Sequence, residues 1–90
     1  MGNKFSSQSS PQRFPEYVRW TLRRGGSAVW AALRVLPNGI ELRHFMDGEL
    51  LWSQLFPKDD GEELRRNLNA ALEAWLGRGW RLDSTHQASA

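Results

Sequence analysis

Four acidic residues stand close together in this chain, at Asp59, Asp60, Glu62 and Glu63. Carboxylates at this spacing could hold a divalent cation or serve as a general acid and a general base. They could also stabilise the start of a helix, where free N–H groups and the helix dipole favour negative charge. We expect these carboxylates to stabilise a helix start, because a helical pattern begins at Gly61.

The other residues with catalytic potential lack the partners that catalysis needs. His44 falls on a predicted apolar strand face and His86 near the C-terminal end, so they form no metal-ligand pair, and we expect His44 to be a hydrogen-bonded core residue. Ser53 has no nucleophile-elbow glycines around it, and Gly25-Gly26 precedes no phosphate-loop Lys. Cysteine is absent. We therefore expect no catalytic residue, metal or cofactor, and a protein that is not an enzyme.

Arginine is the most informative charged residue type. Ten of the twelve Lys and Arg residues are Arg, although the net charge is only +2. A guanidinium binds phosphate or carboxylate with a planar fork and stacks on aromatic rings. A GC-rich genome would raise the arginine content in the same way, so composition alone leaves function and codon bias open.

Alternating apolar and polar residues predict four strands joined by tight turns. The strands are expected at residues 16–23, 27–36, 40–46 and 49–56. Between them stand Gly25-Gly26, Asn38-Gly39 and Asp47-Gly48, which are dipeptides that two-residue hairpin turns favour.

A helix is predicted from Gly61 to Leu76. Its apolar face holds Leu64, Leu68, Ala71, Leu72 and Trp75. Asp60 is placed to cap the first turn with Glu63 as its capping-box partner. Gly77 or Gly79 is expected to end the helix in a left-handed conformation.

These elements predict a single α+β domain over residues 15–82, a four-stranded antiparallel β-meander with one C-terminal α-helix packed on one face. Residues 1–14 and 83–90 are rich in small polar residues and are expected to be disordered tails. The start also matches the myristoylation pattern, with Gly2 as acceptor. We do not expect a membrane anchor, because no Cys is present as a second signal and no apolar run approaches about 18 residues. The lack of Cys suits a reducing cytoplasm.

Two-residue turns fix the strand registers and therefore the two faces of the sheet. The expected pairs are Leu22–Val29, Trp20–Ala31, Val18–Leu33, Val35–Leu42, Leu33–His44, His44–Leu51 and Ile40–Leu55. We expect the helix to cover the apolar face, which holds Val18, Trp20, Leu22, Val29, Ala31, Leu33, Val35, Ile40, Leu42, His44, Leu51 and Leu55.

The opposite face is predicted to interleave arginine with aromatic residues. Its candidate binding residues are Tyr17, Arg19, Arg23, Trp30, Arg34, Arg43, Phe45 and Trp52. The register places Arg34 directly across from Arg43, an unfavourable pair unless Glu41 or a bound anion neutralises it. An apolar and basic patch of this kind usually marks an interaction site.

Three interpretations of this face stay open. A protein partner or a second copy of the chain would use Trp, Tyr, Phe and Arg, which interfaces favour. Single-stranded nucleic acid would stack its bases on the aromatics and place its phosphates on arginine. A longer turn or a β-bulge would instead shift one strand and turn some aromatics inward. Our main hypothesis is a non-catalytic module for protein contact or homodimerisation, with nucleic-acid binding as the alternative.

The segments Trp20-Thr21-Leu22-Arg23, Gly39-Ile40-Glu41-Leu42-Arg43, Asp47-Gly48-Glu49-Leu50 and Gly79-Trp80 resemble a small uncharacterised bacterial family of β-rich domains that end in one helix. The resemblance spans about residues 17–80 and implies a compact bacterial module without a known activity. The order of strands followed by a helix and a Gly-aromatic pair also looks like the WGR domain, a nucleic-acid-associated module. The Trp-Gly-Arg triplet of that family is missing here, and the most similar segment is Trp52-Ser53-Gln54. The layout is similar to Whirly-type single-strand-binding proteins as well.

Overall fold

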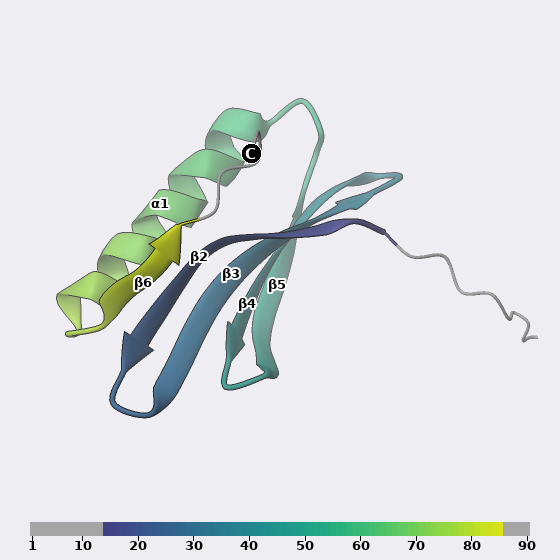
Figure 1. Cartoon of the computed structure of the whole chain (residues 1–90). Coiled ribbons are helices and arrows are strands. Elements are labelled where there is room, and N and C mark those ends of the chain that lie inside the picture. Colours follow the sequence, from purple (N-terminus) through teal and green to yellow (C-terminus); the bar gives the residue numbers. More distant parts are fainter. Residues whose placement is uncertain (1–13, 86–90) are drawn as a thin grey trace, which may run out of the picture.

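The computed structural model describes residues 14–85, which form one antiparallel sheet of five strands with a helix on one of its faces (Figure 1). In chain order the elements are β2 (Glu16–Arg24), β3 (Ser27–Leu36), β4 (Gly39–Met46), β5 (Glu49–Phe56), α1 (Gly61–Gly77) and β6 (Arg81–Thr85). The α+β class, the four-stranded meander and the C-terminal helix are confirmed. Gly2, His86, the N-terminal tail up to residue 13 and residues 86–90 lie outside the described residues.

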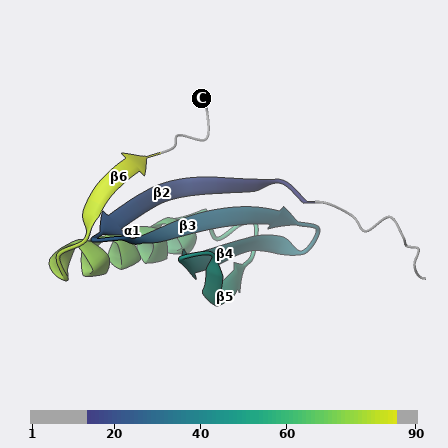
Figure 2. The ribbon, with the colours of Figure 1, turned by 60° about the horizontal axis from the view of Figure 1, so that its bottom comes forward.

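The strand β6 was not predicted. It pairs antiparallel with β2, so the sheet order is β5-β4-β3-β2-β6, with β5 and β6 at opposite edges (Figure 2). The expectation of a disordered tail from residue 83 is therefore wrong for residues 83–85. The segment Arg-Leu-Asp-Ser-Thr has a single large apolar residue, so its own pattern predicts no strand. The segment forms a strand because its backbone pairs with the free edge of β2.

A β-bulge in β2 corrects the predicted position of Tyr17. The pairs Leu22–Val29 and Trp20–Ala31 are confirmed, but the register shifts between Val18 and Trp20. Tyr17 is now opposite Leu33, on the face that meets the helix, and Val18 moves to the other face opposite Ala32. One extra residue in a ladder reverses the direction of every side chain beyond it.

A second bulge, in β5, corrects the position of Trp52. The register shifts between His44 and Phe45, so that Trp52 rather than Leu51 is opposite His44. Trp52 therefore lies on the helix-facing side of the sheet and not on the opposite face. By the same shift Phe56 enters the core, whereas Leu55 is 46% exposed. The third interpretation of the sequence, a β-bulge that shifts a strand, thus holds for β2 and for β5.

The turn between β3 and β4 also differs from its prediction. Its two residues are Pro37 and Asn38, because Leu36 pairs with Gly39. Each β4 residue is therefore displaced by two positions from the expected register. A displacement of two leaves the faces unchanged, since side chains alternate with a period of two.

The core lies between the sheet and α1. It consists of Trp20, Leu22, Val29, Ala31, Leu42, Phe56, Leu64, Leu68 and Trp80, with Ala71, Leu72 and Trp75 packed against it. The predicted apolar face of the helix is thus confirmed. Trp80 follows the helix and packs edge-on against Trp75, with ring centroids 5.3 Å apart, which secures the end of α1 to the sheet.

The ends of α1 are only partly as predicted. Asp60 occupies the N-cap position, but its side chain makes no capping hydrogen bond. Glu63 instead accepts hydrogen bonds from Arg66 and Asn67 within the helix. Gly79, with φ of 96°, supplies the expected left-handed residue after the helix. No helix within residues 14–85 has both the length and the apolar character to cross a membrane.

Candidate functional site

Five of the eight predicted binding residues remain together on the sheet face that points away from α1, here called the outer face. They are Arg23, Trp30, Arg34, Arg43 and Phe45. Trp30 stacks on Phe45 with ring centroids 5.4 Å apart, and the Arg43 guanidinium lies 5.0 Å from the centre of the Phe45 ring. Arg19 lies at the β2 bulge, whereas Tyr17 and Trp52 belong to the other face.

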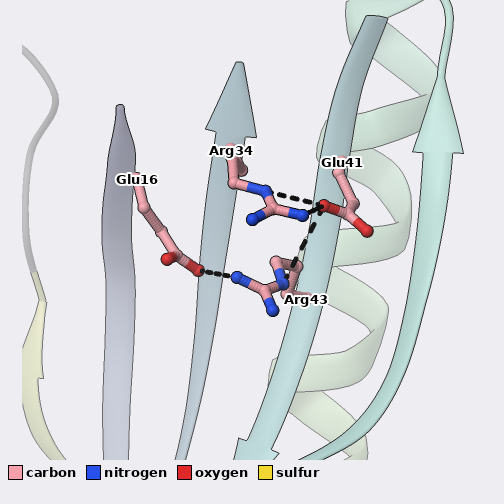
Figure 3. A network of polar contacts seen from close by, with 4 residues as sticks. All are labelled: Glu16, Arg34, Glu41 and Arg43. Atoms are coloured by element: carbon pink, nitrogen blue, oxygen red, sulfur yellow. Dashed lines mark hydrogen bonds and ion pairs between the residues drawn. The ribbon is translucent and has the colours of Figure 1, made fainter. Parts of the chain in front are cut away.

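The arginines of the outer face are neutralised by carboxylates of the chain itself. Arg34 forms an ion pair with Glu41 at 2.8 Å, and Arg43 forms one with Glu16 at 3.0 Å (Figure 3). Glu41 also lies 3.9 Å from Arg43 and so joins the two pairs. This network holds as many carboxylates as guanidinium groups.

The predicted Arg34–Arg43 cross-strand pair is therefore wrong. Arg34 is opposite Glu41, and Arg43 is opposite Ala32, because the β3–β4 turn uses Pro37 and Asn38. Opposite charges across a ladder stabilise it. The outer face consequently needs no bound anion, and the argument for phosphates on Arg34 and Arg43 loses its main support.

The most apolar exposed surface lies instead on β5, an edge strand of the sheet. Its exposed large side chains are Leu50, Leu51, Trp52 and Leu55, each between 41% and 47% exposed. From Leu50 to Phe56 the strand carries no charged residue. We call this strand and these four side chains the β5 edge.

The opposite edge of the sheet is built differently. The strand β6 has only 5 residues, and two of them, Arg81 and Asp83, are charged. Asp83 also forms an ion pair with Arg23 of β2. Short edge strands that carry charges resist pairing with further strands. The strand β5 is longer, and its one charged residue, Glu49, stands at its start.

His44 lies inside the sheet's helix-facing side and is fully buried. Its ring stacks on Trp52 at a centroid distance of 4.1 Å and meets Trp20 edge-on at 5.6 Å. Within residues 14–85 neither ring nitrogen has a hydrogen-bond partner, which corrects the expectation of a hydrogen-bonded histidine. Burial lowers the pKa of His44 from 6.5 to about 4, because desolvation penalises the charged ring. This histidine is closed off from any substrate by Trp52.

Residues 14–85 contain no group of three or more His, Cys, Asp or Glu side chains arranged to hold a metal ion. Asp59, Asp60 and Glu62 are exposed at the start of α1, and Glu63 is half-buried there. Their position agrees with the helix-terminus role expected for them.

No protein-family model, curated protein or solved structure matches this chain. The family resemblances therefore stay predictions. What the chain does has to be inferred from its surfaces.

Proposed function

We propose that this protein is a small non-catalytic interaction module that pairs with a second copy of itself through the β5 edge. The observation that carries the proposal is the row of exposed apolar side chains on an edge strand of 8 residues that carries no charge beyond its first residue, Glu49. An edge strand presents unpaired backbone N–H and C=O groups, which another strand can satisfy. The resemblance and the absence of Cys support a bacterial cytoplasm as the setting.

A second copy is the partner that fits best, because the stretch from Leu50 to Phe56 has no charged residue and can meet itself without repulsion between like charges. A two-fold axis would bring the same patch of both copies together, as in most homodimers. In each copy the four exposed side chains would then be shielded from water by the partner copy, which is favourable because apolar surface leaves water.

The outer face can extend this interface. Trp30 is opposite Phe45 in the ladder, and Phe45 is opposite Leu50 of β5. The three side chains form an apolar row across the sheet that ends at the β5 edge. Aromatic residues are enriched in interfaces, so the row favours a protein partner over a nucleic acid whose phosphates would find Arg34 and Arg43 already paired.

Analytical ultracentrifugation tests the proposal with two matched substitutions. Leu55→Lys places a charge on the β5 edge, where it would meet its own copy, and we expect the dimer dissociation constant to rise at least about tenfold. Leu82→Lys is the control, because Leu82 is similarly exposed at 50% but lies on β6 at the other edge. That variant is expected to sediment as the wild type does.

A wild type that remains monomeric at millimolar concentration would refute self-pairing. Equal weakening by Leu82→Lys would also contradict the role of the β5 edge. Binding of a fluorescent single-stranded oligonucleotide that weakens steeply with salt would support the alternative function instead. Trp52 is unsuitable as the test position, since its contact with His44 links it to the core.

A further inference from the structure

A cavity of about 520 Å³ lies at the edge of the sheet opposite to β5. The end of β2, the start of β6, the β2–β3 turn and the connection from α1 to β6 form its walls. Its lining residues are Arg23, Arg24, Gly25, Gly79, Arg81, Leu82 and Asp83. The proposed dimer surface contributes none of these residues, so the two ends of the sheet can be tested separately.

Two of the arginines in this cavity are direct cross-strand partners. Arg23 of β2 is opposite Arg81 of β6. Like charges directly opposite each other destabilise a ladder. The sequence suggested a repelling arginine pair at Arg34 and Arg43, on the outer face. The structure instead has such a pair at Arg23 and Arg81, in the cavity.

The carboxylate in the cavity neutralises one arginine only. Asp83 accepts a hydrogen bond from Arg23 Nε at 3.1 Å. Neither Arg24 nor Arg81 forms an ion pair within residues 14–85. The lining residues therefore carry three guanidinium groups against one carboxylate. This excess contrasts with the balanced network of the outer face.

The cavity wall also exposes backbone without side chains. Gly25 and Gly79 have φ of 60° and 96°, values that favour glycine. A Cβ added at Gly79 would lie 3.9 Å from Arg24 Nε, so any larger side chain there would enter the space beside this guanidinium. Leu82 adds an exposed apolar surface next to the charges.

We propose that this cavity binds the phosphate group of a small molecule, with Arg81 and Arg24 as the principal donors. Arginine forms paired hydrogen bonds to phosphate, and such charge-assisted bonds are strong. The bound anion would also relieve the repulsion between Arg23 and Arg81. The recess is open to solvent, and its volume of about 520 Å³ suits a ligand of small-molecule size.

Titration with pyrophosphate at low ionic strength, followed by amide NMR shifts, tests this site. We expect saturable shifts at Gly25, Gly79 and Arg81. Arg81→Gln and, independently, Arg24→Gln should weaken binding by about tenfold, the usual scale for losing a hydrogen bond to a charged group. Arg65→Gln, which changes an exposed arginine of α1, should bind as the wild type does.

Thermal unfolding provides a second readout with a defined sign. Without anion, Arg81→Gln is expected to have a higher Tm than the wild type, because it removes the repulsion from Arg23. Saturating pyrophosphate should raise the Tm of the wild type more than that of the variant. A purely structural role of Arg81 would lower the Tm in both conditions.

Three results would overturn the site. Shifts that fail to saturate would show that pyrophosphate has no defined position. Equal weakening in Arg65→Gln would show attraction to general positive charge. Oligonucleotide binding that survives both Arg24→Gln and Arg81→Gln, without any pyrophosphate shift, would assign phosphate recognition to another surface.

Discussion

A Gly39→Ala variant is expected to lose about 3 kcal/mol or more of its free energy of unfolding, from backbone strain and overpacking together. Gly39 begins β4 with φ of 155° and is buried. A Cβ at this position would collide with the carbonyl oxygen of Phe56 and approach Leu55 Cδ1 to 3.1 Å. A backbone atom cannot rotate away as a side chain can, so β4 or β5 would have to move.

Gly26→Ala is the matched control for this prediction. Gly26 lies in the β2–β3 turn, has no positive φ, and a Cβ there would have no atom within 4 Å. Its effect is expected to stay within about 0.5 kcal/mol. Urea unfolding of both variants provides the comparison, and equal stabilities would contradict the close approach of Gly39 to the Phe56 carbonyl.

Acidification from pH 6.5 towards pH 4 is expected to lower the free energy of unfolding by up to about 3 kcal/mol through His44 alone. Its pKa is about 4 in the folded protein and 6.5 in the reference state. Between these values the unfolded chain binds a proton that the folded chain excludes. The stability is therefore complete above pH 6.5 and is lost as the pH falls through this window.

His44→Leu should remove this contribution. The ring nitrogens of His44 have no partner within residues 14–85, so replacing the ring with an apolar group of similar size leaves no hydrogen bond broken. The change in unfolding free energy between pH 7 and pH 4.5 should be clearly smaller in the variant than in the wild type. If both proteins show the same change, other groups must dominate the acid response.

Local sequence patterns predicted most of the fold and part of the candidate site. The turn at Gly25-Gly26 and the pairs Leu22–Val29 and Trp20–Ala31 follow from short-range rules, because turn length alone sets the register nearby. Trp30 and Phe45 were correctly grouped although the β3–β4 register was displaced by two residues, because such a displacement leaves the faces unchanged. The sequence did not predict the cavity that contains Arg24 and Arg81, since these residues are distant in sequence and come together only because β6 pairs with β2.

The amino-acid sequence by itself determined the four strands of the meander and the helix, because hydrophobic period and turn-forming residues are properties of neighbours along the chain. Only the tertiary structure decided where Tyr17 and Trp52 point, since each bulge inserts one residue into a ladder and reverses the side chains beyond it. It also decided the strand at Arg81–Thr85, whose backbone hydrogen bonds exist only beside the free edge of β2. That added strand places Arg81 opposite Arg23 and so completes a recess lined by three arginines.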